Sequence, residues 1–181
     1  METKKHKEIF DRCDAIYTIS NSLGECVQQI KKSSKVQTLY NGINLEKFKE
    51  NENIRNSMRE KYGIKPDDIL FMFCGRLVPD KGALELVKAF SKLKKDNVKL
   101  ILVGGVGYSN SGSSAYLEEI KKYANKNVIF TGFLPYEEMP KMYPMADVGV
   151  VPSIFFDPFN LSCIEFCMQI KMLFSRDSCL I

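Results

Sequence analysis

Two cations and two acids are the residues of this chain whose types and positions could do chemistry. Arg76 and Lys81 flank the proline-containing loop "RLVPDK", which leads into a stretch of helical period. They are either ordinary surface charges near a helix start or a binding site for an anion such as phosphate, and the second interpretation is favoured because unpaired cations at a helix start oppose the helix dipole. Asp157 and Glu165 follow the apolar run Asp147–Ser153. From the residues alone they are either a functional pair or a turn-forming Asp before Pro158 and a Glu near a helix start.

Other catalytic and binding motifs are absent from the sequence. The glycines from Gly104 to Gly107 do not continue as G-x-G-x-x-G, which argues against a dinucleotide fingerprint and leaves a simple turn as the interpretation. His6 is the only histidine and lies in a charged leader, so neither a Ser-His-Asp arrangement nor a metal cluster can be assembled. We therefore expect no metal site.

Composition narrows the class of protein further. The 181 residues are 45% hydrophobic, which suits one ordinary domain or one domain with a piece of another. The net charge of +4 comes from dispersed lysines, so no dedicated nucleic-acid surface is expected. The six cysteines form no C-x-x-C pair, a pattern of reduced thiols that indicates the cytosol. Neither a signal peptide nor an apolar run of about 18 residues occurs, so no transmembrane segment is expected.

The elements that position the four residues are strands that alternate with helices. Four apolar runs read as strands buried on both faces: Ile69–Gly75, Val98–Gly105, Asn127–Phe133 and Asp147–Ser153. Helical stretches separate them, which predicts an α/β fold with a Rossmann-like open parallel sheet and helices on both faces. Because ligands bind at the carboxyl edge of such sheets, the loops after these strands should form one site.

The first part of the chain reads as a smaller unit followed by a connector. Ala15–Ser20 and Val36–Tyr40 have strand character, and a helix between them is expected to be capped by Ser20 or Asn21. The charged stretch that follows is interpreted as a connector whose later part is a surface helix ended by Gly63.

With these residues in place, the chain resembles the group-1 (family 4) retaining glycosyltransferases of GT-B fold, particularly bacterial enzymes that build polysaccharides. The resemblance runs from about Asp14 to Glu165, and it rests on the order of several blocks rather than on any one of them. The blocks are "ISNSLGECV", "LYNGINLEKF", "FCGRLVPDKGALELVKAF", "LILVGG", "VIFTGF", "YPMADVGVVPS" and "DPFNLSCIE".

The resemblance implies roles for particular positions. Arg76 and Lys81 would contact the diphosphate of a nucleotide-sugar and balance the charge of the leaving group. Asp157 would contact hydroxyls of the donor sugar and Glu165 those of the ribose, since an ionised carboxylate only accepts hydrogen bonds. The catalytic residues would be Arg76, Lys81 and Asp157. The donor- and nucleotide-binding set would be Gly75, Arg76, Lys81, Gly132, Phe133, Asp157, Phe159, Asn160, Leu161 and Glu165.

The implied reaction transfers a sugar with retention at the anomeric carbon, without a bound metal or a cofactor other than a UDP- or GDP-sugar donor. The acceptor would be a glycan or a lipid-linked molecule. The implied location is the cytoplasm, with peripheral contact at the inner face of the membrane allowed. The implied pathway is synthesis of a bacterial polysaccharide or glycoconjugate.

Departures from the family pattern bear on activity. Asp157 stands where glutamate is usual, Asn160 where glycine is common, and Pro140 should shorten or kink a helix. Residues 1–40 are expected to be a remnant of an N-terminal domain, and residues 41–181 a C-terminal donor-binding domain that lacks its final strand and helices. We therefore expect the incomplete C-terminal half of a GT-B enzyme, inactive alone. The alternatives are a residual nucleotide-sugar binding module and an interaction fragment that completes its fold against another polypeptide.

Overall fold

The computed structural model describes residues 2–30, 35–107, 115–155, 157–169 and 172–175, and it divides into two compact units. The first contains the residues up to Gly42 together with Asp157–Phe159. The second begins at Ile43 and includes everything described from Asn160 onward. Within the described residues, no helix has the length and apolarity needed to cross a bilayer.

The first unit is a small α/β motif. It consists of α1 (Glu2–Asp11), β1 (Ile16–Thr18), α2 (Asn21–Ile30) and β2 (Val36–Thr38), and its two strands pair in parallel. Of the two expected caps, the Ser20 hydroxyl accepts a hydrogen bond from the Leu23 amide at 3.3 Å. The Asn21 side chain instead accepts one from the Thr38 hydroxyl at 2.8 Å, which ties α2 to β2.

The second unit contains the predicted open parallel sheet. Its strands are β3 (Ile69–Cys74), β4 (Val98–Val103), β5 (Val128–Gly132), β6 (Val148–Val151) and β7 (Met172–Ser175). They lie in the order β5-β4-β3-β6-β7, and every pair is parallel. The expectation of an α/β fold with an open parallel sheet is confirmed.

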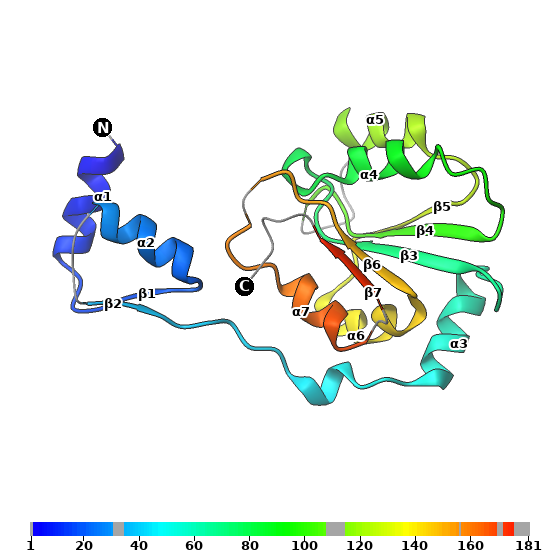
Figure 1. Ribbon diagram of the computed structural model, residues 1–181, viewed down its shortest axis with the longest axis horizontal. Helices are drawn as coiled ribbons and strands as arrows, with labels where there is room; N and C mark the ends of the chain where they lie inside the picture. The colour runs from blue at the N-terminus through cyan, green and yellow to red at the C-terminus, as the bar shows by residue number, and fades with distance from the viewer. Residues whose placement is uncertain (1, 31–34, 108–114, 156, 170–171, 176–181) are drawn as a thin grey trace. The chain divides into compact units, whose positions relative to one another are not determined.

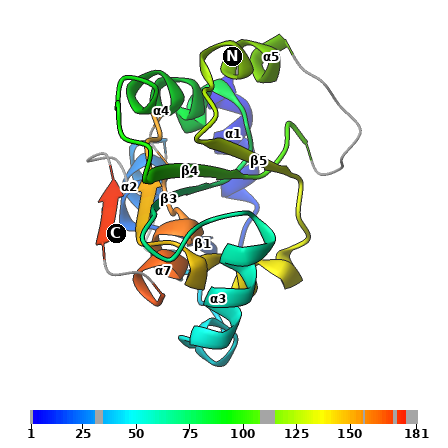
Figure 2. The ribbon, with the colours of Figure 1, turned by 90° about the vertical axis from the view of Figure 1, so that its right-hand side faces the viewer.

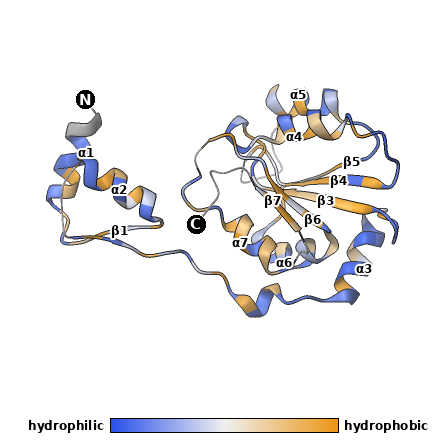
Figure 3. Cartoon of the chain, in the orientation of Figure 1, coloured by the Kyte–Doolittle hydropathy of each residue, from blue (hydrophilic) through white to orange (hydrophobic). Residues whose placement is uncertain are grey.

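Helices cover both faces of this sheet. Figures 1 and 2 show α4 (Ala83–Phe90) and α5 (Ala115–Tyr123) on one face, with α3 (Glu52–Lys61), α6 (Met139–Met142) and α7 (Leu161–Cys167) on the other. Two apolar clusters fill the layers: Leu100 and Val87 belong to the first, Met72 and Phe166 to the second. The central strands β3, β4 and β6 are hydrophobic in Figure 3 and mostly buried, as expected for strands covered on both faces.

Short 3₁₀ helices complete the second unit at Leu45–Phe48, Pro79–Lys81, Tyr136–Glu138 and Tyr143–Met145. The last two flank α6, which contains Pro140 and is only four residues long. The expectation that proline shortens this helix is confirmed.

The helix α3 lies at the surface, as expected. It ends before Gly63, whose φ is 66°, as predicted. However, Met58 and Arg59 are buried, at 9% and 4% exposure. Arg59 is buried because its guanidinium donates to the carbonyl oxygens of Met145 at 2.9 Å and Asp68 at 2.5 Å. The helix α3 is therefore a surface helix with one buried face.

The strand β7 also departs from the expectation that no strand follows Glu165. Met172–Ser175 pairs with β6 over its whole length, from Val148↔Met172 to Val151↔Ser175. Its apolar residues can extend the sheet because β6 otherwise presents unpaired backbone groups at that edge. The sheet consequently gains one more strand than the sequence pattern predicts.

Candidate functional site

Glycines let the loops after β3, β4 and β5 pack directly on one another. Gly104 has a φ of 140°, and a Cβ placed on it would lie 2.0 Å from the Gly75 carbonyl oxygen. Only glycine fits this position. The Gly104 amide donates to the Gly132 carbonyl at 3.1 Å, and the Gly75 amide donates to Val103 at 3.0 Å. Backbone therefore forms this part of the carboxyl edge, where a ligand can approach closely.

The loop after β3 is fixed by its backbone while Arg76 stays exposed. The Leu77 amide donates to the Gly105 carbonyl at 2.9 Å, which joins this loop to the end of β4. Among the described residues, the Arg76 guanidinium has no hydrogen-bond or ion-pair partner. Lys81 is half-buried at the end of the short 3₁₀ helix. A well-placed loop thus presents an uncompensated positive charge at the sheet edge.

The same loop is locked to the segment after β6. Gly82, the N-cap of α4, has a φ of 71°, and a Cβ there would lie 2.1 Å from the Pro152 carbonyl oxygen. The carbonyl of Asp80 accepts hydrogen bonds from the amides of Ile154 at 2.9 Å and Phe155 at 3.3 Å. The loops that follow β3 and β6 are therefore one packed assembly.

Glu165 lies on α7, which is anchored to the end of β3. The Ser162 hydroxyl donates to the Cys74 carbonyl at 3.2 Å. Glu165 is 4% exposed, and its Oε2 accepts a hydrogen bond of 2.5 Å from the Tyr143 hydroxyl. Its Oε1 is buried and makes no hydrogen bond with any described residue. One carboxyl oxygen is thus held in place and the other is left unsatisfied.

The protonation of this cluster follows from its burial. Desolvation raises the pKa of Glu165, and the hydroxyls of Tyr143 and Tyr136 only partly offset it. Burial also raises the pKa of the Cys74 thiol to about 11, and it raises that of Tyr143. Cys74 and Tyr143 are accordingly protonated near neutral pH, and each has a hydrogen to donate.

The second unit brings most of the predicted site residues to one region. Gly75, Arg76, Lys81, Gly132 and Phe133 follow the carboxyl ends of β3 and β5. Asn160 and Leu161 begin α7, where Asn160 is the N-cap with an extended φ of −88°. This conformation does not require the glycine that is common in the family.

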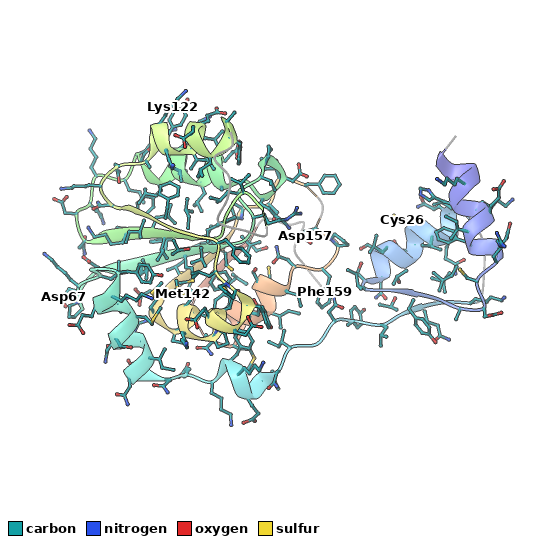
Figure 4. All side chains as sticks on the ribbon, turned by 180° about the vertical axis from the view of Figure 1, so that it is seen from behind. Cys26, Asp67, Lys122, Met142, Asp157 and Phe159 are labelled. Carbon is teal, nitrogen blue, oxygen red and sulfur yellow. The ribbon has the colours of Figure 1, made fainter. Side chains whose placement is uncertain are left out.

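Asp157 and Phe159 belong to the first unit rather than the second. Figure 4 labels both on the segment that leads into α7. Phe159 packs against Tyr40, with ring centroids 6.1 Å apart, and Asp157 is half-buried. The two acids, paired in the sequence, are therefore held by different parts of the fold.

Sequence reasoning missed the residues that surround Glu165. Tyr143, Tyr136 and Cys74 come from separate segments, and nothing in their spacing signals that they converge on one carboxyl. It also missed the amino edge of the sheet, where Arg55 and Arg59 contact Asp147. The i, i+4 spacing of these arginines is the signal that could have revealed a shared face. Within the described ranges, no group of three His, Cys, Asp or Glu side chains could hold a metal ion.

Comparison with known proteins finds relatives that are named as glycosyltransferases. An uncharacterized glycosyltransferase of Methanocaldococcus jannaschii is 32% identical over 86% of this chain, and a lipopolysaccharide 1,2-N-acetylglucosaminetransferase of Salmonella typhimurium is 28% identical over 87%. The matches cover 40% and 42% of these relatives, so the chain spans about two fifths of their length.

Solved structures show the same fold. A glycosyltransferase of Rickettsia africae has a TM-score of 0.80 at 19% identity, over 96% of this chain and 48% of that one. Anabaena HepE in complex with UDP-glucose has a TM-score of 0.76 at 20% identity, over 86% and 43%. The family model for glycosyl transferases group 1 matches residues 54–179, well over half of the chain. The chain belongs to the group 1 glycosyl transferases.

Proposed function

We propose that the second unit binds the nucleotide diphosphate of a nucleotide-sugar at its carboxyl edge. The observation that carries the proposal is the loop from Arg76 to Lys81, which the backbone fixes beside half-buried glycines while Arg76 has no described partner. A planar guanidinium suits bidentate contact with phosphate, and the lysine adds a second positive charge. Both would stabilise the charge that develops on the leaving diphosphate.

The remaining assignments follow from the family. Glu165 would accept hydrogen bonds from the ribose hydroxyls, and Asp157 would accept them from the donor sugar. Gly132 and Phe133 would lie against the base. The solved HepE complex with UDP-glucose supports a donor of this class. UDP- and GDP-sugars are both consistent with the residues present.

The proposed reaction of the complete enzyme is transfer of the sugar to a glycan or lipid-linked acceptor, with retention at the anomeric carbon, in polysaccharide or glycoconjugate synthesis. Acceptor binding is assigned to a further N-terminal domain. We propose a cytoplasmic location, which the free cysteines among the described residues support, and allow peripheral contact with the inner face of the membrane. Turnover by the 181-residue chain alone is not expected, so binding is the activity to measure.

Calorimetric titration of UDP and GDP tests the proposal. Arg76→Ala and Lys81→Ala should each weaken binding by about 1.5–3 kcal/mol, the range of charged hydrogen bonds. The matched control is Lys122→Ala, an exposed cation on α5 that should leave affinity unchanged. If the chain binds neither nucleotide, or if all three variants bind alike, the proposal fails.

A second titration separates the two acids. Asp157→Asn should leave affinity for the bare nucleotide unchanged and weaken affinity for the nucleotide-sugar, because only the latter carries the hexose hydroxyls. Glu165→Gln should weaken both. Equal losses for both ligands in Asp157→Asn would remove its assignment to the sugar.

A further inference from the structure

Two phenols approach the Glu165 carboxyl, and they differ in how firmly they are held. Tyr143 is fully buried, whereas Tyr136 is 48% exposed. The Tyr143 hydroxyl donates to Oε2 at 2.5 Å. The Tyr136 hydroxyl lies near enough to lower the pKa of the carboxyl, yet Oε1 makes no hydrogen bond within the described residues.

Packing fixes the ring of Tyr143 on two sides. Phe166 meets it edge-on, with ring centroids 4.8 Å apart and planes at 82°, and Phe48 lies at 5.8 Å. Phe166 is the next residue after Glu165 on α7, so the same helix turn carries both the carboxyl and a wall of the tyrosine pocket. The phenol therefore has little freedom to leave Glu165.

The direction of the Tyr143 hydrogen is also fixed. Cys74 interacts with the phenol from the end of β3, and burial keeps this thiol protonated because its pKa is about 11. The Tyr143 hydroxyl carries one hydrogen, and it donates this hydrogen to Oε2 of Glu165.

A carboxylate held in this way has one oxygen to offer. A buried acceptor without a partner costs about 1–3 kcal/mol, and a ligand hydroxyl that reaches it recovers this cost. Because Oε1 is buried, a neighbouring side chain must shift first, and Tyr136 is the neighbour that borders both Glu165 and solvent.

We propose that Tyr143 is a positioning residue for nucleotide binding: it holds Oε2 of Glu165 so that Oε1 accepts from the ribose diol, and the ligand displaces Tyr136. This inference rests on the proposed function. It makes discrimination between ribose and 2′-deoxyribose depend on a residue that does not itself touch the ligand. It also gives the two tyrosines opposite roles, one supporting the site and one covering it.

The test is calorimetric titration of the 181-residue chain with UDP, GDP and their 2′-deoxy counterparts. Tyr143→Phe removes one hydroxyl and should lower affinity for the ribonucleotide about tenfold, the equivalent of one charged hydrogen bond. Affinity for the 2′-deoxynucleotide should change much less, so the ribose preference falls. Glu165→Gln should lower the same preference, and the double variant should lose no more than Glu165→Gln alone.

Two further variants complete the design. Tyr136→Phe should leave ribonucleotide affinity unchanged or raise it, since it removes a group that the ligand displaces. Tyr123→Phe on α5 is the matched control and should change nothing. Thermal unfolding of Tyr143→Phe shows whether it folds, and Glu165→Gln tests the same interaction from the other partner.

The outcomes separate the two proposals. If the unmodified chain binds none of the nucleotides, the proposed function fails and this inference fails with it. If the chain binds but Tyr143→Phe loses ribose and deoxyribose ligands equally, or loses neither, only the positioning role is overturned. A loss in Tyr136→Phe as large as in Tyr143→Phe would overturn the division of roles between the tyrosines.

Discussion

Asp147 and Glu165 are two carboxyl groups in one unit, and their surroundings shift their pKa values in opposite directions. Asp147 directly precedes β6, where its Oδ2 accepts from the Leu70 amide at 2.8 Å. Burial opposes its ionisation, but the Leu70 amide and the arginines Arg55 and Arg59 outweigh burial and lower its pKa. Burial dominates at Glu165 and raises its pKa.

The difference separates a carboxylate that stabilises the fold from one for which we propose a ligand-binding role. Asp147 is paired with permanent cations and a backbone amide, so its charged form is favoured in the folded chain. Glu165 has only neutral phenols, and one of its oxygens lacks a described partner. Strained or unsatisfied groups persist where the surrounding packing enforces them, and they are commonly part of a functional site.

Among the substitutions that test this comparison, removal of Arg59 should lower the free energy of unfolding the most. Its guanidinium contacts Asp147 and the carbonyl oxygens of Met145, Lys65 and Asp68. Arg59→Ala should lower the free energy of unfolding of the second unit by about 3–5 kcal/mol, because it leaves buried acceptors uncompensated. Chemical denaturation measures this, with the exposed Lys61→Ala on the same helix as control. A loss below 1 kcal/mol would show that Asp147 does not depend on its cations.

The loss of folding stability at acid pH should depend on the protonation of Asp147. Its pKa in the folded state lies below the ordinary 3.8, so its contribution is present above that pH and is lost as the pH falls through the lowered value. Asp147→Asn should cost about 1.5–3 kcal/mol at neutral pH, the range of charged hydrogen bonds, and nearly nothing at the lowest pH. Denaturation curves from pH 2 to 7 check this, and a cost independent of pH would contradict it.

Gln169 offers a third case, a buried polar group with no described partner and no proposed ligand. It is 6% exposed and lines a small pocket of about 90 Å³ beside Asp147 and Arg55, yet both polar atoms of its side chain are unsatisfied. Gln169→Met keeps the shape and should raise the free energy of unfolding by about 1–3 kcal/mol. Gln169→Glu is the contrasting variant and should destabilise the unit. If Gln169→Met destabilised it instead, the amide would have a partner in solution.

The smallest expected effect is that of Glu165 on the pH dependence of stability. Its sign is opposite to that of Asp147. Its pKa in the folded state lies above 4.5, so the protonated form favours folding. Its contribution is full below that pH and is lost as the pH rises through the raised value. In Glu165→Gln, the decline in stability between acid and neutral pH should be reduced, as measured by denaturation without nucleotide. If the decline in stability were unchanged in Glu165→Gln, groups other than Glu165 would cause it.

Periodicity was sufficient to predict the strands β3, β4, β5 and β6 and the carboxyl edge at which we propose the site. The runs from Ile69 to Ser153 are apolar at nearly every position, and only strands buried on both faces require that pattern. It also placed Arg76 and Lys81 correctly in the loop after β3. These inferences depend on local sequence and on the general rule that ligands bind at the carboxyl edge of a parallel sheet.

The surroundings of the acids could not be read in the same way. Tyr143 contacts Glu165 across 22 positions, and Arg59 contacts Asp147 across 88. Such long-range pairs follow from how the elements pack rather than from local spacing. The strand β7 was missed because Met172–Ser175 has little sequence signature of its own and acquires its conformation by pairing with β6.

The close packing of Gly82 on Pro152 ties the loop that follows β3 to the segment that follows β6. The amides of Ile154 and Phe155 both point at the Asp80 carbonyl, next to Lys81. A shift of the Lys81 backbone on phosphate binding would stretch or shorten those hydrogen bonds. In a nuclear magnetic resonance titration, these two amide signals should therefore shift with the resonances of Lys81, which makes them internal reporters of occupancy at a distance along the chain.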